Sequence, residues 1–317
     1  MAREGYLIKA FSTDQFELPL PAGHRFPMVK YRQLRESLEG HETICLLEPP
    51  AASDEQLMLC HNPLYVKQLC TGTLDEKAMK RIGFPWSVAM VERSRRSVGA
   101  TIAACEAACE AAYQSTLGSP SFSSPAIAFN LAGGTHHAHS DFGSGYCCFN
   151  DAAVACFWMQ SQSSVERVTI IDLDVHQGDG TAALLSGRPN TLTCSIHGQS
   201  NFPFRKCESD IDIGLPDRTT DNDYLNAVHE LLEAIDRHPQ SDLLIYLAGV
   251  DPLREDRLGR LHVSLEGLYR RDQLVLRFAK DRGIPIAIAM AGGYSEPIEL
   301  TVKAHLQTFE CALEVYG

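Results

Sequence analysis

The sequence predicts an α/β protein with a mostly parallel central sheet and helices on both faces. Three observations support this prediction: short apolar runs typical of strands buried on both sides, helical segments that alternate with them, and polar clusters that follow the runs directly. The expected strands are AIAFNLAG from Ala126, VTIIDLD from Val168, TLTCSIH from Thr191, DLLIYLAG from Asp242 and PIAIAMAGG from Pro285.

The expected helices are identified by composition and by the spacing of their apolar residues. Ser94–Gln114 is rich in Ala with little to break a helix, and Asn222–Arg237 and Leu265–Lys280 repeat apolar residues on one side. The Ser- and Pro-rich stretch Ser115–Pro125 is expected to be a loop within a domain. Because we find neither a linker nor an internal repeat, residues 1–317 are expected to form a single domain.

Composition excludes several classes of protein. The chain has 317 residues, of which 44% are hydrophobic and 21% charged, an ordinary globular balance. No apolar run is long enough for a membrane span and the first residues lack a secretion signal, so a soluble, cytoplasmic protein is expected. The eleven Cys contain no CxxC pair, which favours buried free thiols over disulfides or a zinc finger. The net charge of −12 argues against nucleic-acid binding and would tolerate a cationic substrate.

Polar side chains follow four of the expected strands. Because the carboxyl ends of parallel strands meet at one edge of a sheet, where diverging loops leave a crevice, these side chains are expected to converge. They are His136 and His137 after the first run, Asp172, Asp174 and His176 after the second, Asp251 after the fourth and Tyr294 after the fifth.

The motif DLDVH suggests a metal site. Asp172, Asp174 and His176 alternate with apolar residues, so an extended strand would project all three on one side. Together with the distant Asp251, Asp174 and His176 would give a three-ligand site with an open position for water, typical of catalytic zinc, and iron(II) would accept the same ligands. Taken alone, the motif also fits an edge strand with a solvated face.

The paired histidines suit acid–base chemistry. Gly133 and Gly134 permit a bend that would bring the rings of His136 and His137 together, since adjacent side chains in an extended segment point apart. Imidazoles near a metal-bound water would act as general base and acid. Two carboxylates that could orient them, Asp172 and Asp179, lie nearby in the sequence.

Two other residues bear on the chemistry. Tyr294 follows two glycines directly after a buried strand, so its hydroxyl could donate to an oxyanion opposite the metal, although an isolated tyrosine is more often a packing residue. Cys194 alternates with apolar residues and is expected to be buried and inert.

At these residues the sequence resembles the zinc-dependent histone deacetylase superfamily. The blocks GGTHHAHSDFGSGYCCFND from Gly133, DLDVHQGDGT from Asp172, LAGVDPL from Leu247 and AGGYS from Ala291 match its motifs in the same order. The resemblance runs from about residue 21 to 297 and implies the three-layer fold of the arginase and deacetylase type, as a catalytic domain without a regulatory tail. AGHRFPMVKY from Ala22 and the stretch from Arg254 are most similar to the class IV branch and its bacterial relatives.

The resemblance implies a set of catalytic roles. It implies that His137 is the general base and that His136 is its electrostatic partner. It implies that Asp172 pairs with His136, that Asp179 pairs with His137, and that Tyr294 polarises the acyl carbonyl.

The resemblance also implies ligands for ions and for substrate. One catalytic Zn²⁺ would be bound by Asp174, His176 and Asp251. A structural K⁺ or Na⁺ would be bound by Asp172, Asp174, His176 and Ser195. The residues expected to contact substrate are Gly145, Tyr146 and Phe202 in an acyl-lysine tunnel and Arg25 at the base of an acetate pocket.

The expected activity is removal of acetyl or longer acyl groups from lysine side chains of a protein or peptide, with inhibition by hydroxamates. Three alternatives remain open: deacetylation of small amines such as acetylpolyamines, a manganese ureohydrolase of the arginase type, and a non-catalytic binding domain. Gln177 and Gly178 supply no ligands for a second metal, and no ligand of the first is lost. The stretch around Arg81–Met90 lacks the acidic rim residue of many histone-directed members, which leaves peptide recognition open.

Overall fold

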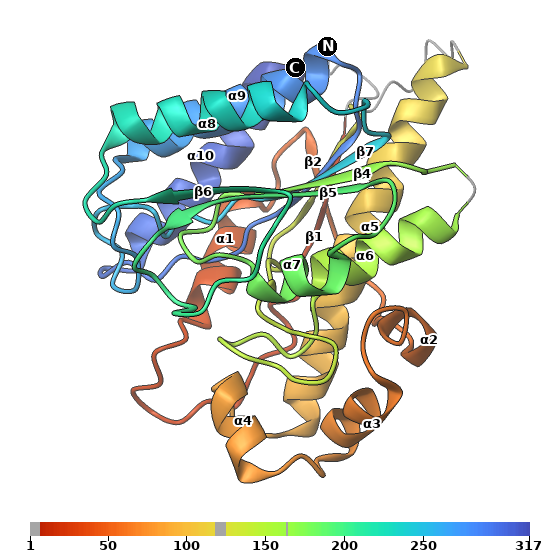
Figure 1. Ribbon diagram of the computed structural model, residues 1–317, viewed down its shortest axis with the longest axis vertical. Helices are drawn as coiled ribbons and strands as arrows, with labels where there is room; N and C mark the ends of the chain where they lie inside the picture. Colours follow the sequence, from red (N-terminus) through yellow and green to blue (C-terminus); the bar gives the residue numbers. More distant parts are fainter. Residues whose placement is uncertain (1–6, 118–124, 163) are drawn as a thin grey trace.

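A single sheet of eight parallel strands organises the computed structural model, which describes residues 7–117, 125–162 and 164–317 (Figure 1). Its strands, in chain order, are β1 (Ile8–Phe11), β2 (Ile44–Leu47), β3 (Ile127–Asn130), β4 (Val168–Asp172), β5 (Thr191–Gly198), β6 (Ile211–Leu215), β7 (Leu243–Leu247) and β8 (Ile286–Ala289). Their order in the sheet is β2-β1-β3-β8-β7-β4-β5-β6, and every neighbouring pair is parallel. The predicted α/β class with a mostly parallel sheet is confirmed.

Helices cover both faces of the sheet and make three layers (Figure 1). They are α1 (Val29–Leu38), α2 (Asp54–Leu57), α3 (Pro63–Thr71), α4 (Glu76–Ile82), α5 (Val88–Thr116), α6 (Asp151–Ser161), α7 (Asp179–Leu185), α8 (Asp221–Ile235), α9 (Leu265–Asp281) and α10 (Glu299–Tyr316). Successive side chains of a strand point to opposite faces of the sheet, so the hydrophobic core consists of two parts, one on each face. In β7, Leu244 and Tyr246 pack with α1, α8, α9 and α10, whereas Leu243, Ile245 and Leu247 pack with α5, α6 and α7.

The expected elements are present, with shifted ends. All five predicted strands form, and β1, β2 and β6 join them as strands that we did not predict. Helix α5 begins at Val88 instead of Ser94, because the side chain of Ser87 caps it by accepting a hydrogen bond from the backbone N–H of Met90. The same helix continues to Thr116, so the loop expected from Ser115 starts later than predicted, and residues 118–124 of that stretch lie outside the described residues.

Two expectations from composition were tested. All eleven Cys are free, and six of them are buried, including Cys194 on β5, where burial raises the pKa of the thiol well above its usual value. Among the described residues, no helix has the length and apolar character needed to cross a bilayer.

A buried ion pair fastens α9 to its neighbours. Arg271 and Asp272 are 0% and 1% exposed, and Nε of Arg271 donates to Oδ1 of Asp272 at 2.9 Å. Asp272 also accepts hydrogen bonds from the hydroxyls of Tyr246 on β7, at 2.6 Å, and Thr308 on α10, at 2.8 Å. The guanidinium of Arg271 further donates to the carbonyl of Gly249, two residues before Asp251. The pair therefore fixes the segment after β7 that carries Asp251, a predicted metal ligand.

Replacing Arg271 with Ala should lower the free energy of unfolding by about 3–5 kcal/mol, since it leaves the Asp272 carboxylate buried without its cation. Urea denaturation at pH 7 measures this change. The matched control is Arg270→Ala, because Arg270 is exposed on the same helix and its loss should cost less than about 0.5 kcal/mol. Equal midpoints for the two variants would show that the buried pair does not stabilise the fold.

Candidate active site

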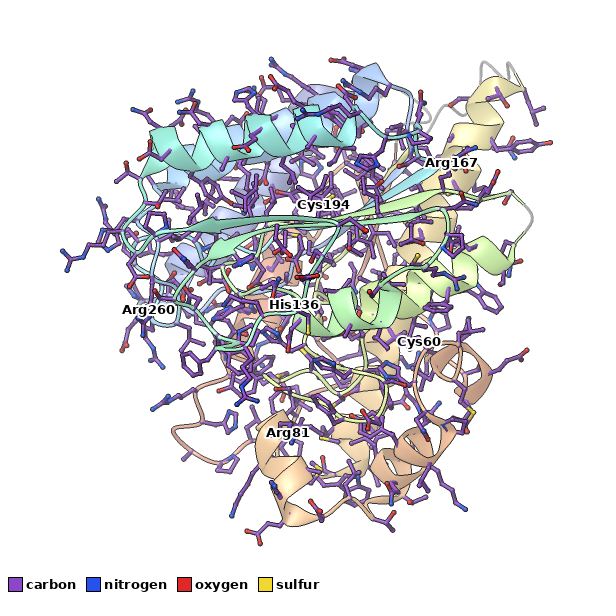
Figure 2. The ribbon with its side chains drawn as sticks, in the orientation of Figure 1. Cys60, Arg81, His136, Arg167, Cys194 and Arg260 are labelled. Carbon is purple, nitrogen blue, oxygen red and sulfur yellow. The ribbon has the colours of Figure 1, made fainter. Side chains whose placement is uncertain are left out.

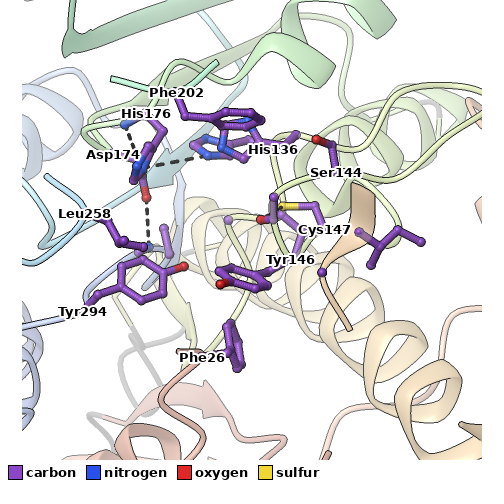
Figure 3. A pocket seen from close by; sticks show the side chains of 18 of the residues that line it. Phe26, His136, Ser144, Tyr146, Cys147, Asp174, His176, Phe202, Leu258 and Tyr294 are labelled. Atoms are coloured by element: carbon purple, nitrogen blue, oxygen red, sulfur yellow. Dashed lines mark hydrogen bonds and ion pairs between the residues drawn. The ribbon is translucent and has the colours of Figure 1, made fainter. Parts of the chain in front are cut away.

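The polar residues predicted at the strand ends do converge. They follow β3, β8, β7 and β4, which are four neighbouring strands of the sheet. Figure 2 shows His136 on the same side of the molecule as Arg81 on α4 and Arg260 on the loop after β7, whereas Arg167, which precedes β4, lies at the other end of the strands. A cavity of about 860 Å³ opens at this edge of the sheet. Its lining includes His136, His137, Asp174, His176 and Tyr294 (Figure 3).

Three side chains form a group suited to a metal ion. Asp174, His176 and Asp251 each offer one ligand atom, and these atoms lie within 4.8 Å of one another. Asp251 is fully buried; its Oδ1 accepts a hydrogen bond from the backbone N–H of Val175 at 2.9 Å, whereas its Oδ2 accepts no hydrogen bond and has Nδ1 of His176 3.2 Å away. A buried carboxylate oxygen without a donor is costly, and a cation would compensate it. The donor set of two carboxylates and one imidazole fits Zn²⁺ or Fe²⁺.

A bend, and not an extended strand, gathers these ligands. Strand β4 ends at Asp172, so the prediction that the strand continues to His176 is wrong. The carboxylates of Asp172 and Asp174 each accept a hydrogen bond from the backbone N–H two residues later, at 3.1 and 3.0 Å. These local bonds compete with the ladder of the sheet and turn the chain.

Gly292 makes room for the two carboxylates. Its N–H donates to Oδ2 of Asp174 at 2.9 Å. A Cβ atom at this position would lie 2.2 Å from Oδ2 of Asp251 and 2.4 Å from Oδ2 of Asp174. No other residue type fits so close to the carboxylates, which explains the glycine in the AGGY segment.

The histidine pair has the contacts that the sequence predicted. Gly133 and Gly134 have φ angles of 78° and 68°, and the chain bends so that the ring centroids of His136 and His137 lie 4.2 Å apart. Nδ1 of His136 lies 2.7 Å from Oδ2 of Asp172. Nδ1 of His137 lies 2.6 Å from Oδ1 of Asp179.

Burial and neighbouring charges separate the pKa values of the two histidines. Burial lowers the pKa of His136, but the carboxylates of Asp172 and Asp174 outweigh it and raise the pKa to about 9. Burial and the positive His136 lower the pKa of His137 to about 4, with Asp179 only partly opposing them. At pH 7 His136 is therefore cationic and His137 neutral.

A buried hydrogen-bond network, which sequence reasoning missed, holds the histidine loop. Asp151 accepts hydrogen bonds from the backbone N–H groups of Gly134 and Thr135, at 3.0 and 2.7 Å. The side-chain amide of Asn150 donates to the carbonyl of His136 at 3.2 Å, while its Oδ1 caps helix α6. Asn and Asp at the start of a helix are a recognisable capping signal, but the sequence does not show which distant loop they also bind.

Aromatic side chains line the cavity. The ring of Tyr146 packs 5.3 Å from those of Phe26 and Phe84 and 6.3 Å from that of Tyr294, measured between centroids. The ring of Phe202 packs edge-on to His137 at 4.9 Å. In Figure 3, Tyr294 and Tyr146 project into the cavity from one side, and Phe202 and His136 from the other. The expected tunnel residues Gly145, Tyr146 and Phe202 all line this cavity, and Phe26 and Phe84 are additions that we did not predict.

The segment that carries Tyr294 is fixed from two sides. The backbone N–H of Tyr294 donates to Oδ2 of Asp256 at 2.6 Å. Nζ of the buried Lys30 donates to the carbonyls of Ala291 and Gly293, each at 3.2 Å, and lies 5.2 Å from the centre of the Tyr294 ring. Burial raises the pKa of Tyr294 well above its usual value, so the phenol keeps its proton at neutral pH.

Arg25 does not lie where it was expected. It is exposed and lines the mouth of the cavity, so its placement at the base of a pocket is wrong. The reason is local: Arg25 belongs to the surface segment before α1, whereas Lys30 lies on α1 and is buried beneath the Tyr294 segment. Ser195 is buried opposite Asp172 in the β4–β5 register, and its Oγ lies 3.0 Å from Nδ1 of His197; its role at a monovalent cation stays a prediction.

The pH dependence of stability should reveal one further histidine of this network. Nδ1 of the buried His61 lies 2.9 Å from the carbonyl of His139, and its Nε2 accepts a hydrogen bond from the backbone N–H of Asn150 at 2.9 Å. Burial lowers the pKa of His61 to about 4 from 6.5. Below pH 6.5 the unfolded chain binds a proton that the folded chain does not, so stability falls as the pH drops from 6.5 to 4, by about 3 kcal/mol for this group.

The His61→Gln variant should therefore lose less stability than the wild type between pH 6.5 and pH 4. Urea denaturation across this range measures both curves, and their difference isolates His61 from the other buried histidines. Parallel curves would mean that His61 does not titrate as its surroundings indicate.

Comparisons with known proteins agree with this geometry. Residues 24–309 match the model of the histone deacetylase domain. An uncharacterised protein of Picosynechococcus sp. is 40% identical over 94% of this chain and 96% of its own length. Histone deacetylase 2 of Arabidopsis thaliana is 31% identical over 80% of this chain, which spans 64% of that longer protein.

Solved structures support the fold. The crystal structure of a histone deacetylase homologue from Aquifex aeolicus superimposes with a TM-score of 0.75 at 21% identity, covering 98% of this chain and 88% of that one. The same fold was found in a homologue complexed with SAHA, with the same TM-score, identity and coverage. Because the domain model matches most of its length, this chain belongs to the histone deacetylase family.

Proposed function

We propose that the protein is a zinc-dependent amidohydrolase that removes acetyl or longer acyl groups from lysine side chains. The observation that carries the proposal is the grouping of Asp174, His176 and Asp251 beside a neutral and a cationic histidine in one cavity. When bound, Zn²⁺ would supply a Lewis acid for the acyl carbonyl and lower the pKa of a water molecule.

The residues of the chain supply the proton transfers. Neutral His137 is able to take a proton from the attacking water, because its Nδ1 is held by Asp179 and Nε2 remains for the reaction. The same ring then returns that proton to the leaving amine. Cationic His136, held by Asp172, stabilises negative charge that develops beside it. The protonated hydroxyl of Tyr294 donates to the developing oxyanion.

The shape of the cavity supports an acyl-lysine substrate. Tyr146 and Phe202 offer aromatic faces to the methylene chain of a lysine. Beyond the histidines the lining includes Ser94, Ser97 and Phe149, so the cavity extends toward α5 and α6. This depth supports acyl groups longer than acetyl, in keeping with the resemblance to the class IV branch. The buried carboxylate and hydroxyl at Asp172 and Ser195 would hold a structural K⁺ or Na⁺.

Removing a metal ligand should abolish zinc binding. The Asp251→Ala and Asp174→Ala proteins should each retain less than a tenth of the zinc of the wild type. A site with three protein ligands loses most of its affinity for the metal when one ligand is removed. Metal analysis after dialysis measures the content, and calorimetry with a hydroxamate reports the accessible metal. Asp281→Ala, an exposed position, serves as control. Full zinc occupancy in both ligand variants would refute the assignment.

The central test is hydrolysis of one peptide that carries acetyl, octanoyl or myristoyl lysine, with acetylspermidine alongside. The zinc-loaded wild type should cleave at least one acyl-lysine peptide. Tyr294→Phe should lower kcat by about 10²–10³-fold with zinc retained, because only the oxyanion donor is lost. Turnover of acetylspermidine alone would assign the protein to small amines, and no turnover of any substrate would favour a binding domain. Unchanged turnover by Tyr294→Phe would remove that hydroxyl from the mechanism.

A further inference from the structure

The entrance of the cavity carries a charge opposite to that of the chain. Although the net charge is −12, the exposed ionic side chains that line the cavity are all cationic. In the part of the chain that the structure describes, the single carboxylate of the lining is Asp174, deep at the metal site. The entrance cations are Arg25, Lys80, Arg81, Arg257 and Arg260.

These five side chains come from three separate segments. Arg25 precedes α1, Lys80 and Arg81 end α4, and Arg257 and Arg260 lie between β7 and α9. Figure 2 shows Arg81 and Arg260 on separate elements, helix α4 and the segment between β7 and α9, both on the side of the molecule where His136 lies. The positive charge at the opening is therefore contributed by three segments that are far apart in the sequence.

Part of this charge is available to a ligand. Lys80, Arg257 and Arg260 form exposed ion pairs with Glu76, Glu296 and Asp217, at 2.6, 3.1 and 3.4 Å. Exposed pairs of this kind are weak and exchange readily. Arg25 and Arg81 form no ion pair with the described residues; the guanidinium of Arg81 stacks on the ring of Phe142, 4.4 Å from its centre. The entrance of the cavity therefore keeps a net positive charge even when these ion pairs are formed.

We infer that the entrance selects acyl-lysine segments whose flanking residues are acidic, an inference that rests on the proposed function. A bound acyl-lysine would place its neighbouring residues at the mouth, within reach of the five cations. Carboxylates there gain favourable charge contacts, whereas arginine or lysine neighbours are repelled. The exposed ring of Phe204, 83% accessible beside the opening, offers an apolar surface to the same segment. This inference runs opposite to the expectation that the acidic chain would tolerate a cationic substrate.

The test compares three acyl-lysine peptides that differ only in their flanking residues: Asp and Glu, Ser and Gly, or Arg and Lys. At low salt, kcat/KM of the wild type should be about tenfold higher for the acidic peptide than for the neutral one, and lowest for the basic peptide. In 0.5 M NaCl the three values should converge to within about twofold, because salt screens exposed charges.

Variants identify the residues responsible. Arg81→Gln and Arg25→Gln should each reduce the ratio of acidic to neutral kcat/KM by about threefold, and Arg81→Lys should preserve it. Arg167→Gln is the matched control, because Arg167 is a partly exposed arginine at the opposite end of the strands and should leave the ratio unchanged. Equal kcat/KM for the acidic and neutral peptides, or preference for the basic one, would overturn this inference while the proposed function stands. Failure to cleave any of the three would count against the proposed function itself.

Discussion

The structure depends on the burial of several carboxylates at one edge of the sheet. Asp172, Asp174 and Asp251 are each at most 3% exposed. Buried anions are tolerated only where hydrogen bonds and opposite charge replace water. The protein provides both, through His136 and His176 and through the backbone N–H groups that point at the carboxylates. Oδ2 of Asp251 accepts no hydrogen bond and lies 3.2 Å from Nδ1 of His176, and a metal ion held by these side chains would compensate its charge.

The fold could be predicted where a strand is buried on both faces. The five runs found in the sequence are β3, β4, β5, β7 and β8, which are contiguous in the centre of the sheet, with β1 and β2 on one side of them and β6 on the other. The missed strands β1, β2 and β6 lie toward the edges of the sheet, and β2 and β6 are largely half-buried or exposed. In β6, exposed Asp212 interrupts the apolar pattern. Edge strands need fewer apolar residues because one side is less covered, so their signal in the sequence is weak.

The residues of the site also fall into a group that the sequence predicts and a group that it does not. Metal ligands, histidines and Tyr294 could be predicted because each follows a recognisable strand, and parallel topology brings strand ends together. The supporting residues could not. His61, Asn150, Asp151 and Lys30 act through backbone groups of distant segments, and a backbone carbonyl leaves no trace in the sequence. Arg25 was misplaced for the same reason. Only the direction of α1 in the structure shows that Lys30, and not Arg25, is the basic residue buried beneath the Tyr294 segment.

The sheet order has a consequence for biosynthesis. The last strand, β8, inserts between β3 and β7, two strands made long before it. Until residue 289 has left the ribosome, β3 and β7 each expose an open edge, and such edges invite pairing with other chains. The segment that carries Tyr294 is attached to the same strand, so the catalytic pocket and the closed sheet are completed in one late event of translation. A nascent chain stalled before β8 would have neither, which makes the synthesis of the segment from Ile286 to Tyr294 decisive for solubility during translation as well as for activity.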